Sequence, residues 1–252
     1  MNGQHDEHDD QEERLNLLPA LGRDFRAIFS SRNVTWAILA LSLLLQIAYW
    51  YFGAPLPGTP RDPLTGLRSV LWALLLLFLI PLLLARPLEL DGRSLGLSAG
   101  DRRLGRQALL LGIPAAVLIG FLGSFDSGIR FTYPWAGAWA GGSWLAFLSW
   151  SAIYALYYLA YEFFYRGLLL RGLAPSMGWR GALWLQTVAS ALLHLGKPLA
   201  ETIAAVPAGL LFGVIAWRTR SVLYVFLIHL ALGVSTDFFS LLQSGHLAFG
   251  GP

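Results

Sequence analysis

The stretch WLAFLSWSAIYALYYLAYEFFYRG, residues 144–167, gives the clearest indication of the fold. Its first 18 residues carry no charged side chain, and a helix needs about 20 mostly apolar residues to cross the hydrocarbon core of a bilayer. Glu162 and Arg166 then follow four residues apart, on one face of a helix. A charge at bilayer depth costs at least about 2.5–3.5 kcal/mol, so such residues are usually functional. The stretch therefore predicts a membrane-spanning helix with a polar site.

The composition of the whole chain agrees with a membrane protein. Of its 252 residues, 56% are hydrophobic and only 13% are charged, whereas soluble domains carry roughly 25% charged residues. Collagen-like, disulfide-rich and disordered architectures are excluded. Because the chain contains no Cys, disulfides, thiolate zinc sites and cysteine nucleophiles are excluded as well.

Apolar blocks long enough for spanning helices recur along the chain. We expect an all-α, polytopic transmembrane helix bundle of seven spans, at residues 34–52, 69–85, 108–123, 144–166, 181–194, 202–217 and 222–242. A shallow segment around residues 133–140 would make eight, which is the alternative.

The chain divides into four regions by composition. Residues 1–14 are strongly acidic and predicted to be disordered, and residues 15–33 resemble an amphipathic segment at the membrane interface. The predicted regions are the tail and interfacial segment at 1–33, N-terminal transmembrane helices at 34–142, the core helices at 143–244 and a short tail at 245–252.

The distribution of basic residues predicts the orientation in the membrane. If the N-terminus is cytoplasmic, 14 of the 18 Lys and Arg residues fall in cytoplasmic segments and 4 in outer loops. The positive-inside rule favours this arrangement, which places the C-terminus outside. The formal net charge of +3 reflects this topology. Because the basic residues are dispersed among loops, nothing supports a nucleic-acid partner, and the expected partner is the lipid bilayer.

Three predicted spans each carry a line of polar or small residues at four-residue spacing. The lines are Tyr154, Tyr158, Glu162 and Arg166; Gln186, Ser190 and His194; and His229, Gly233 and Asp237. Each has a structural alternative, because Glu162 and Arg166 can form an ion pair between helices and an intramembrane His can be a hydrogen-bond donor. Glu201 is interpreted as a charge favoured by the dipole at the start of the sixth span.

A glutamate and two histidines on separate spans suit hydrolysis in a membrane cavity. A carboxylate at low dielectric can act as general base toward water, and imidazoles can stabilise an oxyanion or bind a metal. No HExxH zinc signature is present, yet a site of His194, His229 and Glu162 assembled across helices, with zinc as the metal, stays open. No G-x-S-x-G motif indicates a nucleophilic serine.

Three segments carry a family resemblance: YEFFYRG at 161–167, ALLHLGKP at 191–198 and FLIHLALG at 226–233. They resemble, in order and spacing, the three motifs of the CAAX prenyl protease 2 and bacteriocin-processing (CPBP, or Abi) family, over roughly residues 145–240. The resemblance implies an all-helical intramembrane endopeptidase that is glutamate-dependent and often described as metal-dependent. It further implies a bacterial inner-membrane protein that acts on a membrane-associated, in eukaryotes prenylated, protein or peptide. The catalytic residues that it implies are Glu162, Arg166, His194 and His229.

The chain departs from this pattern at three positions. The family's first motif usually has two adjacent glutamates, the first being the water-activating base, and Tyr161 stands there. Ser190 replaces a Phe of the second motif, and Gly233 replaces an Asn of the third. Three outcomes stay open: Glu162 acts as base, Asp237 supplies the missing polar group, or the chain is an inactive relative that binds membrane peptides as a scaffold or immunity protein. Possible supporting residues are Asp237, Tyr161, Tyr158 and Ser190.

Overall fold

The computed structural model describes residues 34–86, 88 and 90–248. These residues are arranged in helices and loops, and no strand occurs among them, which confirms the all-α fold. The acidic tail and interfacial segment predicted at 1–33, and the end of the C-terminal tail, lie outside the described residues.

Long helices occupy every one of the seven predicted blocks. They are α3 (Val34–Phe52), the continuous rod α4–η1–α5 (Pro63–Ala73, Leu74–Leu79 and Ile80–Ala85), α6 (Arg102–Gly123), α8 (Trp144–Glu162) continued by η3 (Phe163–Arg171), α9 (Gly172–Leu192), α10 (Leu199–Thr219) and α11 (Leu223–Gln243). The shallow segment expected near 133–140 contains the 3₁₀ turn η2 (Gly137–Gly141), preceded by the short helix α7 (Ser127–Thr132).

Five of the described helices are long and apolar enough to cross a membrane: α3, α4–α5, α6, α10 and α11. Helix α8 is rich in tyrosine and tryptophan, and α9 contains Pro175, Arg180 and Gln186, which lowers the hydropathy of both. The integral-membrane character is thus supported, while the count of seven or eight spans stays a prediction.

Two helices begin earlier than their apolar blocks because of side-chain caps. Asp62 accepts a hydrogen bond from the backbone N–H of Thr65 at 2.8 Å, and Pro63 follows at the first helical position. Asp101 accepts from Arg103 and Leu104 in the same way. With these caps, α4 and α6 begin at Pro63 and Arg102, six residues before the predicted starts at 69 and 108.

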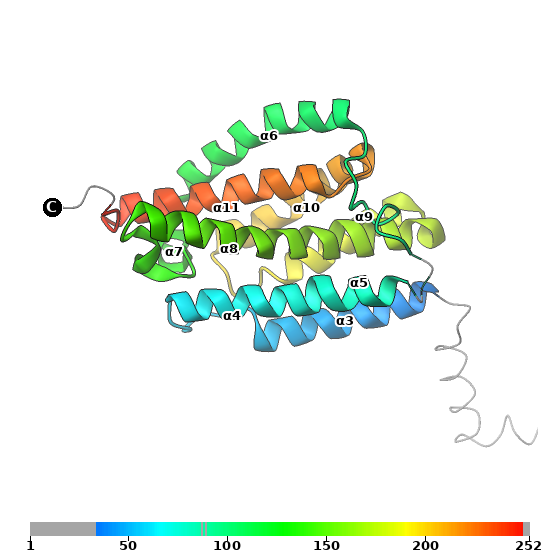
Figure 1. The fold of residues 1–252 in the computed structure, drawn as a ribbon, viewed down its shortest axis with the longest axis horizontal. Helices are drawn as coiled ribbons and strands as arrows, with labels where there is room; N and C mark the ends of the chain where they lie inside the picture. Colours follow the sequence, from blue (N-terminus) through cyan, green and yellow to red (C-terminus); the bar gives the residue numbers. More distant parts are fainter. Residues whose placement is uncertain (1–33, 87, 89, 249–252) are drawn as a thin grey trace, which may run out of the picture.

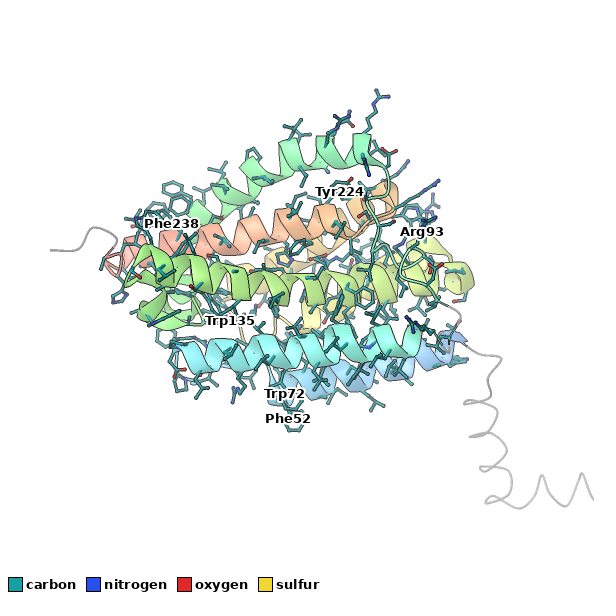
Figure 2. All side chains as sticks on the ribbon, viewed as in Figure 1. Phe52, Trp72, Arg93, Trp135, Tyr224 and Phe238 are labelled. Atoms are coloured by element: carbon teal, nitrogen blue, oxygen red, sulfur yellow. The ribbon has the colours of Figure 1, made fainter. Side chains whose placement is uncertain are left out.

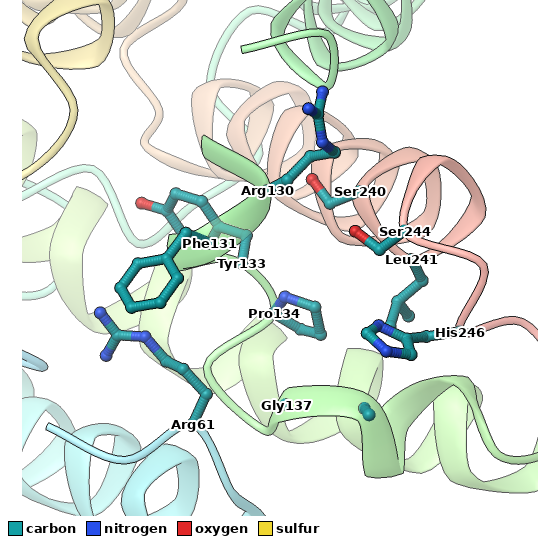
Figure 3. Close-up of a pocket in the computed structure, with 11 residues that line it drawn as sticks. Arg61, Arg130, Phe131, Tyr133, Pro134, Gly137, Ser240, Leu241, Ser244 and His246 are labelled. Carbon is teal, nitrogen blue, oxygen red and sulfur yellow. The ribbon is translucent and has the colours of Figure 1, made fainter. Parts of the chain in front are cut away.

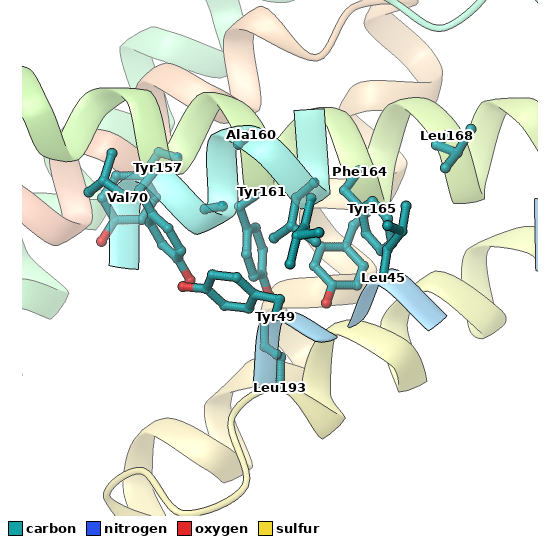
Figure 4. Close-up of a cluster of buried hydrophobic side chains, with 14 of the residues drawn as sticks. Leu45, Tyr49, Val70, Tyr157, Ala160, Tyr161, Phe164, Tyr165, Leu168 and Leu193 are labelled. Carbon is teal, nitrogen blue, oxygen red and sulfur yellow. The ribbon is translucent and has the colours of Figure 1, made fainter. Parts of the chain in front are cut away.

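Helix α8 lies at the centre of the bundle, between α3 with α4–α5 on one side and α11 with α6 on the other (Figure 1). Figure 4 shows Tyr157, Tyr161 and Tyr165 pointing from α8 and η3 toward Tyr49 of α3. The rings of Tyr161 and Tyr165 are 4.6 Å apart, and both side chains are buried. The aromatic side chains of α8 therefore form the core of the protein, and the residues on its other face are directed toward α10 and α11.

The outer faces of the peripheral helices are apolar, and their side chains project outward (Figure 2). Phe52 and Trp72 stack at 5.3 Å on one such face, and Leu110 and Leu111 of α6 are exposed. Exposed leucines over whole helix faces suit a hydrocarbon environment. On the inner face of α6, a Cβ at Gly105 would overlap the ring of Tyr224 and one at Gly112 would lie 2.6 Å from Ile228, so α6 packs closely on α11 and fixes its position.

Candidate active site

A cavity of about 330 Å³ opens between α6, α8, α10 and α11. One side is formed by small residues of α10, among them Ala204, Ala205, Ala208 and Gly209. The polar side chains on its wall are Tyr133, Tyr158, Tyr161, Arg166, His194, Glu201, His229 and Thr236. Of the predicted site residues within the described chain, Glu162, Ser190 and Asp237 are not on this wall.

His229 is oriented by Glu162. The carboxylate of Glu162 is fully buried at the end of α8, and its Oε1 lies 2.6 Å from Nδ1 of His229 on α11. Because an ionised carboxylate only accepts hydrogen bonds, Nδ1 is assigned as the donor. In a neutral imidazole the other ring nitrogen, Nε2, then carries no hydrogen and can accept a hydrogen bond. Glu162 thus contacts a cavity-lining histidine without lining the cavity.

Arg166 provides the positive charge beside Glu162. Its Nε lies 3.2 Å from Glu162 Oε2, and the side chain is 2% exposed. Arg166 Nε and Glu162 Oε2 form an ion pair, but no hydrogen bond joins the two atoms. The guanidinium also lies over the ring of Tyr161, 5.5 Å from the centroid. Arg166 sits in the π-helix η3, which begins directly after Glu162; such wide turns are frequent at functional sites.

His194 is oriented by a backbone carbonyl. It lies just after α9, and its Nδ1 is 2.8 Å from the carbonyl oxygen of Ser190. A carbonyl only accepts, so Nδ1 carries the hydrogen and Nε2 is free in the neutral ring. The hydroxyl of Thr202 donates to the carbonyl of His194 at 2.7 Å, which ties the turn to the start of α10. Ser190 therefore contributes to the site through its backbone, since its hydroxyl donates to the carbonyl of Thr187.

Two tyrosines of α8 pack on the imidazoles. The ring of Tyr161 lies edge-on to both histidines, 6.3 Å from His194 and 5.4 Å from His229. The ring of Tyr158 lies 4.6 Å from His229. A Cβ at Gly233 would overlap the Tyr158 hydroxyl. Tyr158 thus occupies the space beside position 233, which a larger residue would fill.

Asp237 connects two helices outside the cavity. Its Oδ2 accepts a hydrogen bond from the indole N–H of Trp150 on α8 at 2.7 Å. The residue is buried, and Oδ1 has no hydrogen-bond partner within the described part of the chain. The structure therefore does not bring Asp237 together with His194 and His229.

Glu201 lines the cavity, and its place at the site was missed in the sequence. Its Oε1 accepts hydrogen bonds from the Tyr133 hydroxyl at 2.7 Å and from Lys197 Nζ at 2.9 Å, and lies 3.8 Å from His194 Nε2. Burial raises the pKa of the Tyr133 phenol well above its usual value, so the hydroxyl stays a donor. Glu201 is indeed in the first turn of α10. The spacing of Lys197 and Glu201 directly after His194 was the signal that could have found it.

The predicted metal ligands do not form a metal-binding group. Within the described residues, no three His, Cys, Asp or Glu side chains come close enough together to hold a metal ion. Glu162 lies behind His229 and beside Arg166, so it is not directed toward a metal shared with His194. The donor set does not fit the tentative zinc site.

A second cavity of about 370 Å³ lies on the other side of Tyr133 (Figure 3). Arg61, Arg130 and His246 line it, together with serines of α11 and the following turn. Burial lowers the pKa of Arg61. The predicted catalytic residues do not line this cavity, so the candidate chemistry belongs to the cavity between α8, α10 and α11.

Residues 140–234 match the family model described as type II CAAX prenyl endopeptidase Rce1-like. The match includes Glu162, Arg166, His194, Glu201 and His229, and confirms the resemblance seen in the three motifs. No curated protein and no solved structure matches the chain significantly.

Proposed function

Since residues 140–234 belong to the Rce1-like family of type II CAAX prenyl endopeptidases, we propose that the chain is an intramembrane endopeptidase. It hydrolyses a peptide bond in a membrane-associated protein or peptide with a glutamate-activated water. The observation that carries this proposal is the convergence of two imidazoles on one cavity, each held through Nδ1 and each with Nε2 free.

The two imidazoles suit the handling of a water molecule and of a developing oxyanion. A neutral imidazole accepts a hydrogen bond at its free Nε2, and a protonated one donates from it. Arg166 lines the same cavity and adds a positive charge. Glu162 was predicted as the base, but its contacts with His229 and Arg166 favour a positioning role that acts through His229.

The proposed substrate reaches the site from the lipid phase. The wall contributed by α10 consists mainly of Ala and Gly, which leaves room for an extended backbone. A prenylated protein is one candidate, and a peptide matured or neutralised in a bacterial inner membrane is another. A cytoplasmic N-terminus belongs to this proposal as well. The zinc cofactor that the resemblance implied is left out of it, since the described residues offer no group of ligands for the ion, and the metal content of the purified protein tests this point.

A cleavage assay in proteoliposomes tests the function. The probes are an internally quenched farnesylated peptide that ends in a CAAX sequence and the same peptide without the lipid. Profiling of new N-termini in host membranes covers other substrates. We expect hydrolysis by the wild type and a loss of about 10²–10⁴-fold in the His194→Ala and His229→Ala variants. Equal processing by all three would reject the assignment of the histidines.

The same assay separates the enzyme from a binding protein. A wild type that cleaves no membrane peptide, yet retains the farnesylated probe in a pull-down, would support the alternative of an inactive relative acting as a scaffold or immunity protein. The reason to test this alternative is that Tyr161 stands where the family usually has the water-activating glutamate.

A further inference from the structure

Two glutamates contact the histidines of the site, but only one of them lines the cavity. Glu162 is fully buried behind His229. Glu201 is 20% exposed and belongs to the cavity wall. Helix α8 directs Tyr158 and Tyr161 to the wall, and neither of these can serve as a carboxylate base. The described wall therefore offers one carboxylate to a bound water, and it comes from α10.

We propose that Glu201 is the catalytic carboxylate that takes the proton from the attacking water. This assignment rests on the proposed endopeptidase function and identifies the base within it. Glu162 is then a positioning residue, which holds His229 in its tautomer.

The geometry around Glu201 suits a base that shares a water with His194. Oε1 of Glu201 lies 3.8 Å from Nε2 of His194, too far for a direct hydrogen bond. Because Nδ1 of His194 donates to Ser190, two acceptors face each other when the ring is neutral. A water that donates one hydrogen to each would satisfy both.

The second carboxylate oxygen retains its acceptor capacity. The contacts with Tyr133 and Lys197 gather on Oε1, and Oε2 is buried without a hydrogen-bond partner among the described residues. A buried polar atom without a partner costs free energy and calls for a functional or solvent partner. The terminal torsion of a glutamate is broad and roughly two-fold, so rotation about it can present either oxygen to the water.

Glu201 is surrounded by hydrogen-bond donors and by groups that can carry a positive charge. The titratable groups that face it are Lys197 and His194 from the turn after α9, Tyr133 from the loop after α7, and Tyr158 from α8. Lys197 and Tyr133 donate hydrogen bonds to the charged form, and the first turn of α10 adds the favourable end of a helix dipole.

The proposed step balances with one water and one peptide bond. An O–H bond of the water breaks, and the proton goes to the Glu201 carboxylate. The water oxygen bonds to the carbonyl carbon of the substrate, whose π electrons move to the carbonyl oxygen. When the tetrahedral intermediate collapses, the C–N bond breaks and Glu201 returns the proton to the leaving amine.

A matched pair of carboxylate-to-amide variants tests the assignment. Glu201→Gln and Asp237→Asn are compared with the wild type in proteoliposomes, with the farnesylated quenched peptide as probe and host-membrane N-termini as a second readout. We expect kcat to fall about 10²–10⁴-fold in Glu201→Gln with KM little changed. The kcat of Asp237→Asn should stay within about threefold of wild type, corresponding to less than about 0.7 kcal/mol.

A pH–rate profile distinguishes a base from a structural residue. Lys197→Met removes a positive charge next to Glu201, so protonation of the carboxylate becomes easier. If Glu201 is the base, the acidic limb of the profile moves to higher pH. If the base is Glu162, the limb stays where it is, because Glu162 contacts His229 and Arg166 rather than Lys197.

Because Lys197 also faces His194, a shift in Lys197→Met supports Glu201 only if a second variant agrees. Tyr133→Phe, which removes a hydrogen bond to Glu201, must move the limb in the same direction. The two variants together test the assignment even where Glu201→Gln does not fold.

The outcomes separate the two proposals. Full activity of a folded Glu201→Gln variant, or an unmoved acidic limb in Lys197→Met, would overturn the role of Glu201 while leaving the endopeptidase function intact. A wild type that cleaves neither the probe nor any host-membrane peptide would overturn both.

Discussion

The molecule contains two clusters made from the same three kinds of residue. The inner cluster is Glu162, Arg166 and His229, and the cavity cluster is Glu201, Lys197 and His194. In each, a glutamate pairs with a cation four residues away and lies near a histidine. The glutamate and arginine of the inner cluster are 0% and 2% exposed, whereas the glutamate and lysine of the cavity cluster are 20% and 16% exposed.

This difference in burial assigns different roles to similar residues. In the inner cluster a hydrogen bond of 2.6 Å joins carboxylate and imidazole, which fixes the ring. In the cavity cluster the backbone carbonyl of Ser190 orients the imidazole of His194 instead. The carboxylate of Glu201 is therefore not needed to orient that ring. A glutamate close to a histidine is therefore not enough to identify a catalytic base. The carboxylate must also face the cavity, as Glu201 does and Glu162 does not.

The largest expected effect is on the stability of the inner cluster. Arg166→Met leaves Glu162 charged and buried, and removing one partner of a buried ion pair costs about 3–5 kcal/mol. Lys197→Met is the matched variant in the cavity cluster, with an expected loss of about 2 kcal/mol or less, since it removes hydrogen bonds at a partly exposed site. Denaturant unfolding in mixed micelles measures both. Equal losses would contradict the expectation that burial makes the inner ion pair more costly to break.

A smaller loss of stability is expected at the packing beside His229. Gly233→Ala places a Cβ where the Tyr158 hydroxyl lies, and such overpacking costs about 1–3 kcal/mol. Gly181→Ala is the control, because its Cβ would meet nothing closer than 3.7 Å. Combining Gly233→Ala with Tyr158→Leu should recover part of the loss in the same unfolding assay. Additive losses in the double variant would contradict the contact.

The positions of the helices could be predicted because the bilayer imposes a length and a composition on each span. All seven apolar blocks fall on long helices. The starts of α4 and α6 were placed too late, since hydropathy alone ignores the caps at Asp62 and Asp101. Both signals, an Asp before Pro63 and an Asp before Arg102, were present in the sequence.

The chemistry of the site was only partly predictable. His194, His229 and Arg166 line one cavity, and their catalytic roles stay a prediction. The four-residue spacing could not show that Glu162 faces away from that cavity, because this depends on how α8 packs against α11 and on the π-helix that follows. Glu201 was interpreted as a dipole charge only. Its four-residue spacing from Lys197 was present in the sequence, whereas the contact with Tyr133 is tertiary and could not be predicted from it.

Tyr133→Phe tests the hydrogen bonding of Glu201 in the cavity cluster. It removes one of two hydrogen bonds to Glu201 Oε1, and a hydrogen bond to a charged group contributes about 1.5–3 kcal/mol. Because Lys197 remains, we expect a loss near ~1.5 kcal/mol and an acidic limb of the pH–rate profile that moves to higher pH. The exposed Tyr51→Phe should leave both quantities unchanged. If Tyr133→Phe lowered the stability but left the acidic limb of the pH–rate profile unmoved, Tyr133 would have a structural role only.

The smallest effect is expected at Asp237, a buried carboxylate that belongs to neither cluster. In Asp237→Asn the amide oxygen still accepts the hydrogen bond of Trp150, so unfolding should change by less than about 1 kcal/mol. Trp150→Phe, in contrast, leaves the carboxylate buried without that donor and should cost about 1–3 kcal/mol. If Asp237→Asn instead lost activity at unchanged stability, Asp237 would supply the polar group that is missing from the third motif. The division between a positioning and a catalytic glutamate would then have to include a third carboxylate, one that lies outside the cavity wall.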